Sequence, residues 1–447
     1  MIIIKPVMFV LTSLFFNKTG NQSLFETVRG YLKHFDVYLI TSAYLSDKYF
    51  YTLPEVMEKL PDLKVVIPRM RVYNLCKNRH RVKVNHIVTP ARSIEEIRKG
   101  SMQSTHEIVN QEISVGTIIS FHYKAMVLHR SAVKLLNSGV VPQVICAYEI
   151  GGVIPALKLK KKVPEATTFA KFQGTVLGPV LGDISNKDIQ KKFRLDIAAM
   201  KRVHEFDGAI MTNDGTFGDK VLQYFGMKKI LFLPNGLATD FVNQAITEHL
   251  IKHERRTEEN TIRLYTLSRI IPWKRVHLSI EIMNILVNEF RNTHFELKLY
   301  GEAEQTYLLF IEKLVSEYHL EEFVKICGPV PYERVPKVHY DNDILLSLYF
   351  GTNATNTVYE ALYIGNTVIT IEDPNLVEIV GKDHRIIYFG RNLSDKVIAK
   401  QIAEYLNKLW LQDKGVFCEY NMRSDIMSWD ERIEREIEFI NSLKRYA

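Results

Sequence analysis

The chain has 447 residues, of which 46% are hydrophobic and 24% are charged. This length predicts two or three domains, and the composition is ordinary for a soluble globular protein. The four cysteines lie far apart and form no C-x-x-C pair, which argues against a zinc ribbon or a secreted disulfide framework and indicates a reducing cytosol. They are Cys76, Cys146, Cys327 and Cys418.

Charge is unevenly distributed along the chain. Residues 1–235 hold 33 Lys and Arg against 19 Asp and Glu, a net charge of +14, whereas residues 236–447 hold 25 against 32, a net charge of −7. The basic residues of the first half concentrate in residues 68–86 and 157–162. A basic half indicates an anionic partner, such as a membrane surface, a phosphorylated acceptor or nucleic acid, although either cluster alone also fits a solvated surface.

The apolar run at the amino end, MIIIKPVMFVLTSLFF, is predicted to be a buried first strand. Lys5 interrupts the run, and no small-residue cleavage site of a signal peptide follows it. The run is also far shorter than the roughly 20 apolar residues of a membrane-spanning helix. No later segment is predicted to span a bilayer.

Strand-like runs then alternate with helix-like stretches, which is typical of open parallel α/β domains. In the first half the predicted strands cover residues 7–14, 37–40, 63–67, 117–121, 144–147, 167–171, 208–212 and 229–233. A turn and a polar stretch, residues 233–260, predict a domain junction. A second series covers residues 261–268, 295–301, 323–328, 343–349 and 366–372, and residues 428–447 read as an amphipathic helix.

The stretch GTNATNTVYEALYIGNTVI, residues 351–369, has two interpretations at this point. Thr357 and Glu360 have the spacing of a capping box, and Asn356 is another candidate N-cap. Alternatively, the free amides and the positive dipole end of the helix bind a phosphate, while Glu360 accepts hydrogen bonds from a ribose diol.

Two other segments of the second half favour the phosphate. Arg269 and Lys274 follow a predicted strand, and a guanidinium and an ammonium can neutralise a diphosphate without a metal. Gly328, Pro329 and Val330 form a predicted turn whose backbone can contact a flat base. Each segment alone also fits an ordinary solvated loop, but together they predict a nucleoside diphosphate as ligand.

Four stretches carry a resemblance to a known family: SRIIPWK, LYGEAEQ, LPNGL, and the long run from ICGPVPYERV to GNTVI. They resemble the retaining glycosyltransferases of family 4, most strongly over residues 231–380, and SDIMSWDERI is similar to the closing helix of that family. The resemblance implies an α/β protein of the GT-B fold, with two Rossmann-like domains facing across a cleft. It implies an acceptor-binding domain at 1–235, a nucleotide-sugar-binding domain at 236–425, and a helix at 426–447 that crosses back to the first domain.

The resemblance also implies roles for residues of the second domain. Arg269 and Lys274 fall on the residues that hold the donor diphosphate, the turn at residues 328–331 on the base contact, and Glu360 on the later glutamate of an E-x7-E motif. The earlier glutamate is replaced by Thr352, but Asn353 and Asn356 fit an Asn-rich variant of this loop. The implied donor-binding residues are therefore Gly20, Gly328, Pro329, Val330, Thr352, Asn353, Ala354, Thr355, Asn356, Thr357 and Glu360.

In the first domain, FNKTGN resembles the glycine loop of the family, in which Gly20 lets the backbone approach the diphosphate. Tyr148 and Glu149 stand where many members have a His-Asp pair, and Gln173 replaces a histidine that contacts the donor sugar. Arg269, Lys274, Gln173 and Glu360 form the predicted catalytic set. A glutamine can bind a sugar hydroxyl but cannot act as a general acid or base.

The predicted acceptor-binding residues are His122, Tyr148 and Glu149. His122 is placed at the end of the strand predicted at residues 117–121. Its other interpretation is a structural histidine, just as Gln173 also fits a polar residue at a strand end.

A D-x-D string at residues 341–343 matches the metal-binding motif of single-domain transferases. There the motif follows a strand, whereas here it precedes one, so Asp343 is interpreted as structural and no obligatory metal or other cofactor is expected.

The sequence thus predicts a cytoplasmic glycosyltransferase that moves a sugar from a nucleotide-diphosphate sugar to an acceptor hydroxyl, with retention, in polysaccharide or glycolipid assembly. The expected acceptor is a glycan or lipid-linked precursor, and the basic domain is expected to contact the anionic inner membrane face. The alternatives are a nucleotide-sugar 2-epimerase of the same fold and a non-catalytic subunit. Nucleic-acid binding is not expected, because the basic clusters lack a recognisable motif or aromatic platform.

Overall fold

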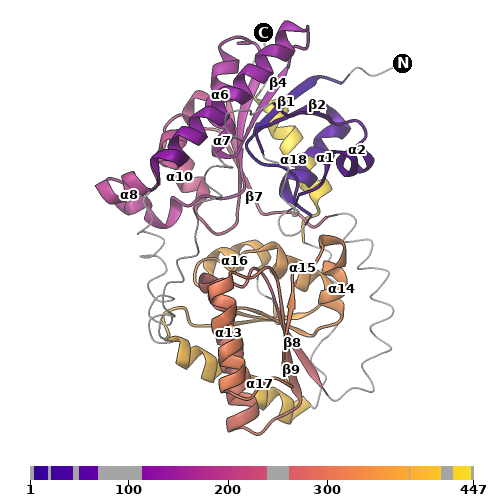
Figure 1. Cartoon of the computed structure of the whole chain (residues 1–447), viewed down its shortest axis with the longest axis vertical. Helices are drawn as coiled ribbons and strands as arrows, with labels where there is room; N and C mark the ends of the chain where they lie inside the picture. Colours follow the sequence, from indigo (N-terminus) through magenta and orange to yellow (C-terminus); the bar gives the residue numbers. More distant parts are fainter. Residues whose placement is uncertain are drawn as a thin grey trace, which may run out of the picture. The chain divides into compact units, whose positions relative to one another are not determined.

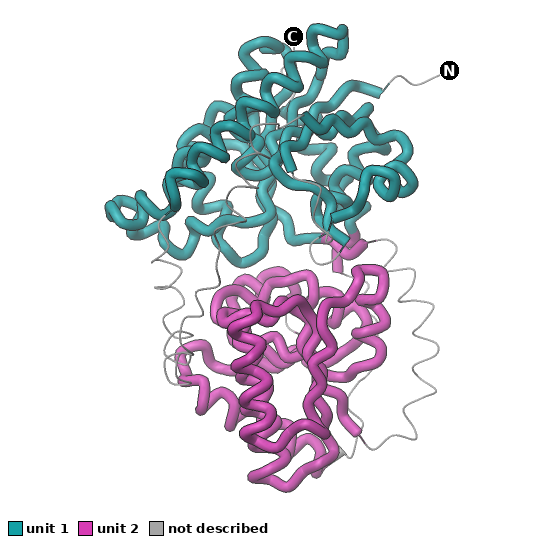
Figure 2. Tube along the Cα trace, in the orientation of Figure 1, with its two compact units in different colours: residues 1–93, 105–235, 429–447 teal, residues 94–104, 236–428 magenta. Residues whose placement is uncertain are grey.

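The computed structural model describes residues 5–18, 22–43, 50–68, 113–238, 261–381, 383–413 and 426–443. These residues form two compact units (Figure 2). Unit 1 contains the described residues up to 235 together with 429–443, and unit 2 contains those from 236 to 428. None of the described helices combines the length and the apolar character that crossing a bilayer requires.

The described part of unit 1 is built on a sheet of seven parallel strands in the order β3-β2-β1-β4-β5-β6-β7 (Figure 1). The strands are β1 Val7–Thr12, β2 Asp36–Thr41, β3 Lys64–Val66, β4 Val144–Tyr148, β5 Thr167–Phe172, β6 Gly208–Thr212 and β7 Ile230–Leu233. The chain leaves β1 toward one edge and returns to β4 on its other side. The order of the strands therefore reverses between β1 and β4, which is the topology of a doubly wound sheet.

The connections of unit 1 are mostly helical, as parallel neighbours require. They are α1 Ser23–His34, α2 Leu53–Lys59, α6 Val115–Asn137, α7 Glu149–Lys160, α8 Lys187–Lys192, α9 Arg194–Met200 and α10 Gly218–Tyr224, with 3-10 turns at Gly178–Asp183 and Val203–Glu205. α7 packs so closely on β1 that a Cβ atom at Gly152 would lie 2.2 Å from the carbonyl oxygen of Leu11. Only glycine fits at that point.

One predicted strand of the first half is wrong. Residues 117–121 lie inside α6, a helix of 23 residues. Ser114 caps this helix by accepting a hydrogen bond from the amide of Thr117, and the buried residues Ala125, Leu128 and Ala132 recur at helical spacing. The β-branched residues of the first turns favoured a strand, but capping and packing of the later turns decide the conformation. His122 consequently lies on the exposed side of a helix and not at a strand end.

The described part of unit 2 holds a second parallel sheet, of six strands in the order β10-β9-β8-β11-β12-β13. The strands are β8 Ile262–Leu267, β9 Phe295–Tyr300, β10 Val324–Gly328, β11 Ile344–Ser347, β12 Thr367–Ile371 and β13 Ile386–Phe389. The sequence predicted all of them except β13, a four-residue edge strand. The helices are α12 Val276–Asn284, α13 Gln305–Glu317, α14 Val335–Tyr340, α15 Asn356–Ile364, α16 Pro374–Val380 and α17 Asp395–Asp413, and α12 continues as a π-helical turn, Ile285–Glu289.

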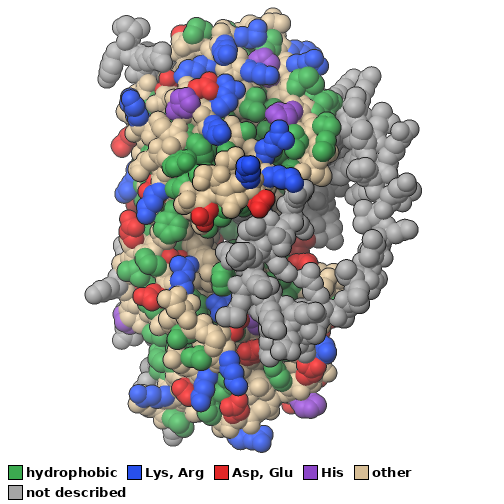
Figure 3. Space-filling model, turned by 90° about the vertical axis from the view of Figure 1, so that its left-hand side faces the viewer, with side chains coloured by type: hydrophobic (Ala, Val, Ile, Leu, Met, Phe, Trp, Pro, Cys, Tyr) green, Lys and Arg blue, Asp and Glu red, His purple; other side chains and the backbone are tan. Residues whose placement is uncertain are grey.

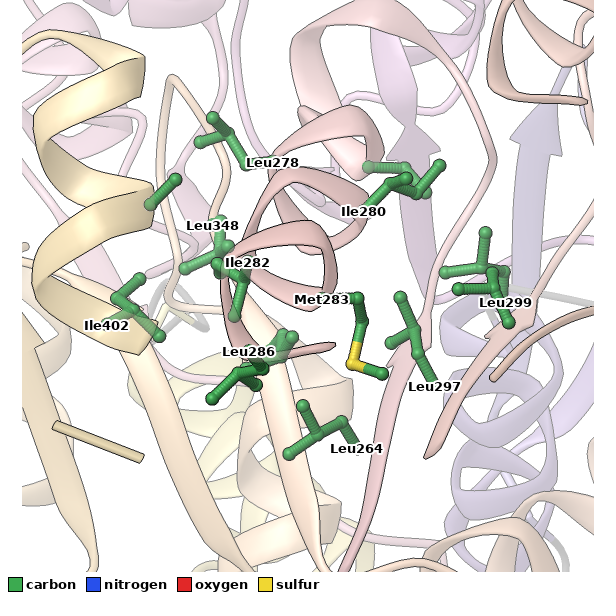
Figure 4. Close-up of a cluster of buried hydrophobic side chains, with 14 of the residues drawn as sticks. Leu264, Leu278, Ile280, Ile282, Met283, Leu286, Leu297, Leu299, Leu348 and Ile402 are labelled. Atoms are coloured by element: carbon green, nitrogen blue, oxygen red, sulfur yellow. The ribbon is translucent and has the colours of Figure 1, made fainter. Parts of the chain in front are cut away.

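The core of unit 2 lies between the sheet and helices α12 and α17 (Figure 4). Leu264 and Leu297 point from the strands toward Met283 and Leu286, while Ile402 contributes from α17. All of these side chains are fully buried. This packing fixes β8 and α12, and with them the loop that joins the two elements.

The final helix, α18 Trp429–Ser442, belongs to unit 1, although the residues before it belong to unit 2. A fully buried polar network attaches it to the sheet. Both carboxylate oxygens of Glu436 lie 2.6 Å from Nζ of Lys171, and Glu436 also accepts hydrogen bonds from Tyr31 (2.7 Å) and Arg432 (2.9 Å). Arg432 donates in turn to Thr212 at the end of β6.

The charges of this network depend on one another. Burial lowers the pKa of Lys171 to about 8, although Glu436 acts to raise it. Burial acts against ionisation of Glu436 as well, but Lys171 and Arg432 keep its pKa below the usual range. Removing one member would leave buried charges without partners, which costs more than the pair itself contributes.

We therefore expect Glu436→Gln to lower the free energy of unfolding by about 3–5 kcal/mol, because the buried Lys171 and Arg432 lose their shared carboxylate. Urea unfolding monitored by circular dichroism measures the change. The matched control is Glu438→Gln, an exposed glutamate of the same helix, for which we expect less than about 0.5 kcal/mol. Equal losses in the two variants would contradict the role given to the network.

Candidate functional site

The predicted ligand-binding segments of unit 2 follow strands of one parallel sheet, so they share its carboxyl edge. The loop with Arg269 and Lys274 follows β8, the turn at Gly328 closes β10, and residues 348–355 lead from β11 into α15. In open α/β sheets, this edge is where ligands bind. The structure thus brings the three segments to one edge, with β8 and β11 as direct neighbours.

Arg269 and Lys274 lie close enough to influence each other, as the sequence suggested. Burial, followed by the charge of Arg269, lowers the pKa of Lys274 well below its usual range. Arg269 is exposed, whereas Lys274 is partly buried at the end of a 3-10 turn, Pro272–Lys274. The Nζ atom of Lys274 lies 3.4 Å from the ring centroid of Tyr349 and 4.0 Å from that of Trp273.

The next residue fixes the course of this loop. Arg275 has a φ of 52°, in the left-handed region that few residues other than glycine adopt. Its buried guanidinium donates to Asp395 at 2.5 Å, and Asp395 also lies 3.1 Å from Nε2 of His277. This ion pair to α17 holds the strained residue in place and ends the 3-10 turn just after Lys274.

The start of α15 differs from the predicted capping box. The helix begins at Asn356, its N-cap is Thr355, and Thr355 makes no side-chain capping bond. Thr357 already lies inside the helix, where its hydroxyl donates to the carbonyl of Leu267 at 3.2 Å. The capping-box interpretation of Thr357 and Glu360 is therefore wrong. The hydroxyl oxygen of Thr355 is buried and has no hydrogen-bond partner among the residues that the structure describes.

The loop before α15 is held by a single carboxylate. Asp373, which follows β12, accepts hydrogen bonds from the amide of Asn353 (2.7 Å) and the hydroxyl of Thr352 (3.1 Å). The side-chain oxygen of Asn353 accepts from Ser347 and from the amide of Tyr349. Asn353 is only 1% exposed. Its side chain shapes the loop from inside, and Ala354 beside it is buried too.

Glu360 belongs to a buried chain of polar groups. Its Oε2 atom lies 3.5 Å from Nε2 of His339, whose Nδ1 atom lies 2.6 Å from the hydroxyl of Tyr265. The side-chain amide of Asn366 donates to that hydroxyl at 2.9 Å. These contacts agree if Tyr265 donates to Nδ1 and Nε2 carries the proton that faces Glu360. These contacts hold the carboxylate of Glu360 in one orientation. His339 was not among the residues predicted from the sequence.

A turn follows β10, as predicted, and Gly328 is its first residue. Gly328 has a φ of 74°, and its carbonyl accepts from the amide of Gly301 at 2.8 Å. Pro329 is exposed and Val330 is partly buried. The turn thus lies at the surface beside the end of β9.

In unit 1, three predicted residues meet at the carboxyl ends of β4 and β5. The amide of Gln173 donates to Oε1 of Glu149 at 2.7 Å, and the Gln173 side chain donates to the hydroxyl of Tyr148 at 2.9 Å. The hydroxyl of Thr212 lies 3.4 Å from the side-chain oxygen of Gln173. These contacts fix which way the amide of Gln173 points.

Glu149 has two features of a functional carboxylate. Its φ is 59°, an uncommon value that costs free energy in a residue with a side chain. Burial raises its pKa to about 7, although the bond from Gln173 lowers it, and Asp214 contributes to the increase.

Asp214 was not among the residues predicted from the sequence. Burial raises its pKa to about 6, and a Cβ atom at Gly174 would lie 2.0 Å from its Oδ2 atom, so the carboxylate packs directly against this backbone. The signal was present, because Asp214 stands two residues after the predicted strand 208–212.

Other predicted residues either fall outside the described residues or have different surroundings from those expected. Gly20 and nearly all of the basic cluster at residues 68–86 fall outside the described residues. His122 lies on α6, as noted above. Asp343 directly precedes β11 and accepts a hydrogen bond from the amide of Arg263 at 2.9 Å, which is a structural contact. Within the described ranges, no three His, Cys, Asp or Glu side chains are grouped so that they could hold a metal ion.

Residues 248–414, less than half of the chain and within unit 2, match the family model for glycosyl transferases group 1. No curated protein is similar enough in sequence to match the chain.

Many solved structures do resemble it. HepE of Anabaena, in complex with UDP and glucose, is 14% identical, with a TM-score of 0.61, and the match covers 98% of this chain and 99% of that chain. WaaG, a glycosyltransferase involved in lipopolysaccharide biosynthesis, is 12% identical (TM-score 0.55; 97% and 95% covered).

TarM of S. aureus, in complex with UDP and alpha-GlcNAc-glycerol among other ligands, is also 12% identical (TM-score 0.55; 98% and 100% covered). At sequence identities this low, structural similarity shows the fold alone. The chain has the GT-B fold, as predicted, and over residues 248–414 the resemblance to group 1 glycosyltransferases is confirmed.

The raised pKa of Glu149 predicts a pH-dependent stability. Between the ordinary value of 4.5 and about 7, the folded chain keeps a proton that the unfolded chain has released. The free energy of unfolding should therefore fall as pH rises through this window, by up to about 3 kcal/mol. Glu149→Gln should remove the part of this dependence that Glu149 contributes and leave the smaller part that the raised pKa of Asp214 contributes below about pH 6.

Urea unfolding at pH 5, 6, 7 and 8 measures the difference between the two proteins. The control is Glu165→Gln, an exposed glutamate just before β5, which should retain the dependence of the wild type. A Glu149→Gln variant with an unchanged pH dependence would show that Glu149 ionises normally.

Proposed function

We propose that this chain is a glycosyltransferase that moves a sugar from a nucleotide-diphosphate sugar to an acceptor hydroxyl, with retention and without a metal. One observation carries the proposal. Arg269, Lys274 and the start of α15, which lacks a side-chain cap, share one edge of a parallel sheet. Two cations and a helix start are the groups that bind a pyrophosphate.

The same groups serve the chemical step. When the bond between sugar and diphosphate breaks, negative charge develops on the leaving phosphate oxygens. The Arg269 guanidinium can bind two of these oxygens, Lys274 supplies a point charge, and the amides at the start of α15 add partial positive charge. The hydroxyl of Thr355, which is buried without a partner among the described residues, is a further group that we assign to the phosphate.

The remaining donor contacts follow along this edge. We assign the nucleoside base to the turn Gly328, Pro329 and Val330, which lies at the surface. We assign the ribose to Glu360, whose carboxylate is oriented by its contact with His339. Thr352 and Asn353 act indirectly, because their polar groups bind Asp373 and the neighbouring backbone and so shape the phosphate loop.

Unit 1 supplies the acceptor side of the proposal. Tyr148, Glu149 and Gln173 present hydroxyl, carboxylate and amide groups at the carboxyl edge of its sheet. Such groups bind the hydroxyls of a sugar. We assign Tyr148 and Glu149 to the acceptor. Gln173 stands where the family has a histidine that contacts the donor sugar, and because it cannot exchange a proton we assign it to binding of that sugar. Glu149 has a pKa of about 7, so it is the group here that can change its charge near neutral pH.

We further propose a glycan or lipid-linked acceptor in cell-surface polysaccharide or glycolipid assembly, and a cytoplasmic protein that contacts an anionic membrane surface. The charge of unit 1 supports this contact. In Figure 3 the upper part of the surface, which unit 1 forms, carries more Lys and Arg than Asp and Glu. Lys158 on α7 and Lys162, which follows α7, lie near His129 of α6. Burial lowers the pKa of His129, and the charges of the two lysines lower it further.

A second candidate is a non-catalytic subunit of the same fold. The observation that favours it is that Thr352, Asn353 and Gln173 are engaged by the protein itself. Such a subunit is not expected to bind nucleoside diphosphates. The experiment below therefore separates the two candidates.

We expect one of UDP, GDP or ADP to raise the melting temperature of the full chain, because binding to the folded state stabilises it. Arg269→Ala and Lys274→Ala should each weaken binding of that diphosphate about 10- to 100-fold in calorimetric titrations, through loss of a charge-assisted contact. Transfer from the matching nucleotide sugar should fall at least as much.

Lys313→Ala serves as control, because Lys313 is an exposed cation of unit 2 on α13 that pairs with Glu317. It should bind like the wild type. Wild-type affinity in the Arg269 and Lys274 variants would refute the site, and no response to any of the three diphosphates would favour the non-catalytic subunit.

Metal removal gives a separate prediction. Because two cations and a helix start supply the positive charge, we expect the diphosphate affinity to change by less than about twofold when EDTA is added. Calorimetric titration with and without EDTA measures it. A strong loss of affinity in EDTA, restored by Mg²⁺ or Mn²⁺, would contradict the metal-free proposal.

A further inference from the structure

Lys274 differs from the buried cations Lys171, Arg275 and Arg432 in what surrounds it. Lys171 and Arg432 bind Glu436, and Arg275 binds Asp395. Within the residues that the structure describes, no carboxylate lies at ion-pair distance from Lys274. Two aromatic rings take that place, those of Trp273 and Tyr349.

Both ring contacts are short for a cation and an aromatic ring. Such contacts are effective within about 6 Å of the ring centroid, and here Nζ lies 4.0 Å from Trp273 and 3.4 Å from Tyr349. The two rings meet edge to face, with their centroids 5.9 Å apart. The ammonium thus lies at the junction of two ring systems.

The rings are held in place by the loops that carry them. The carbonyl of Trp273 accepts from the amide of Phe350 at 3.1 Å, which joins the β8 loop to the loop after β11. Tyr349 is 3% exposed, and its amide donates to the side chain of Asn353. Asn353 in turn is bound to Asp373. The position of the rings therefore depends on the same contacts that shape the start of α15.

An ammonium on two rings is stabilised less than one that is paired with an anion. Burial and the neighbouring charge of Arg269 both disfavour the charged form of Lys274, and they lower its pKa. An incoming diphosphate would supply the missing negative charge. The rings keep the four-carbon side chain ordered until then, so less side-chain entropy is lost when the phosphate binds.

We infer that Trp273 and Tyr349 are positioning residues that hold the Lys274 amine ready for the diphosphate of the donor. This inference rests on the proposed function, because it assumes that Lys274 meets a diphosphate. It gives a role to two residues that the family resemblance did not assign to the donor site. Their role is to act through Lys274 and not to touch the donor themselves.

The test is a double-mutant cycle on the full chain, with Trp273→Leu and Lys274→Met as the single changes. The probe is whichever of UDP, GDP or ADP binds the wild type, and calorimetry measures its Kd. We expect Trp273→Leu to weaken binding about fivefold, and Trp273→Phe, which keeps a ring, to stay within about twofold of the wild type. In the Lys274→Met background, Trp273→Leu should have no further effect, because the two changes are then coupled.

A purely structural role for Trp273 would give the same loss in both backgrounds, and that result would overturn the inference. So would a Trp273→Leu variant that binds like the wild type. Thermal unfolding without ligand identifies variants that fail to fold, and Trp273→Met then replaces Trp273→Leu in the cycle. If the wild type binds none of the diphosphates, the proposed function and this inference fail together; if it binds but the cycle shows no coupling, only the inference fails.

Discussion

In a parallel sheet every strand points the same way, and the chemistry of this protein depends on that constraint. Each strand of unit 2 delivers the residues that follow it to one edge, so groups separated by a hundred residues become neighbours there. Lys274 follows β8, Tyr349 follows β11, and Asp373 follows β12. The diphosphate site that we propose is therefore a property of the whole edge and not of one loop.

Contacts that run across this edge connect its loops to one another. Asp373 holds the loop before α15 through Thr352 and Asn353, and Thr357 binds the end of β8. Arg275 is held in a left-handed conformation by its ion pair with Asp395. These contacts use polar groups that a reader of the sequence would assign to a ligand. The groups that we propose for ligand binding are instead the backbone at the start of α15 and the two cations Arg269 and Lys274.

The buried cations Lys171 and Arg432 and the partly buried Lys274 have different surroundings. In unit 1, Lys171 and Arg432 both bind the carboxylate of Glu436, which attaches α18 to the sheet and makes the helix part of the core. In unit 2, the Lys274 amine is surrounded by rings and lies near a second cation. The first arrangement is complete by itself, whereas the second gains from an added anion. This contrast is the reason why we assign Lys171 and Arg432 to the fold and propose Lys274 as a ligand-binding residue.

Much of the secondary structure was predictable, because it is set by local patterns. The buried strands of both units are short apolar runs, and the closing helix shows its amphipathic spacing in the sequence. The prediction failed at residues 117–121, where β-branched residues resemble a strand, and at β13, which is only four residues long. In both places packing against the rest of the unit decides the conformation, and packing is not visible in a short window of sequence.

The candidate site divides in the same way. The sequence by itself determined the order of the elements, the cations at 269 and 274, and the position of α15, since each depends on residues close to one another along the chain. Only the tertiary structure decided what those residues contact. It places two rings around Lys274, Asp373 against the loop before α15, and His339 against Glu360. It also buries Glu149 and Asp214, which raises their pKa values. The physical reason is that burial and charge–charge interactions depend on distance in space, and the partners come from strands far apart in the chain.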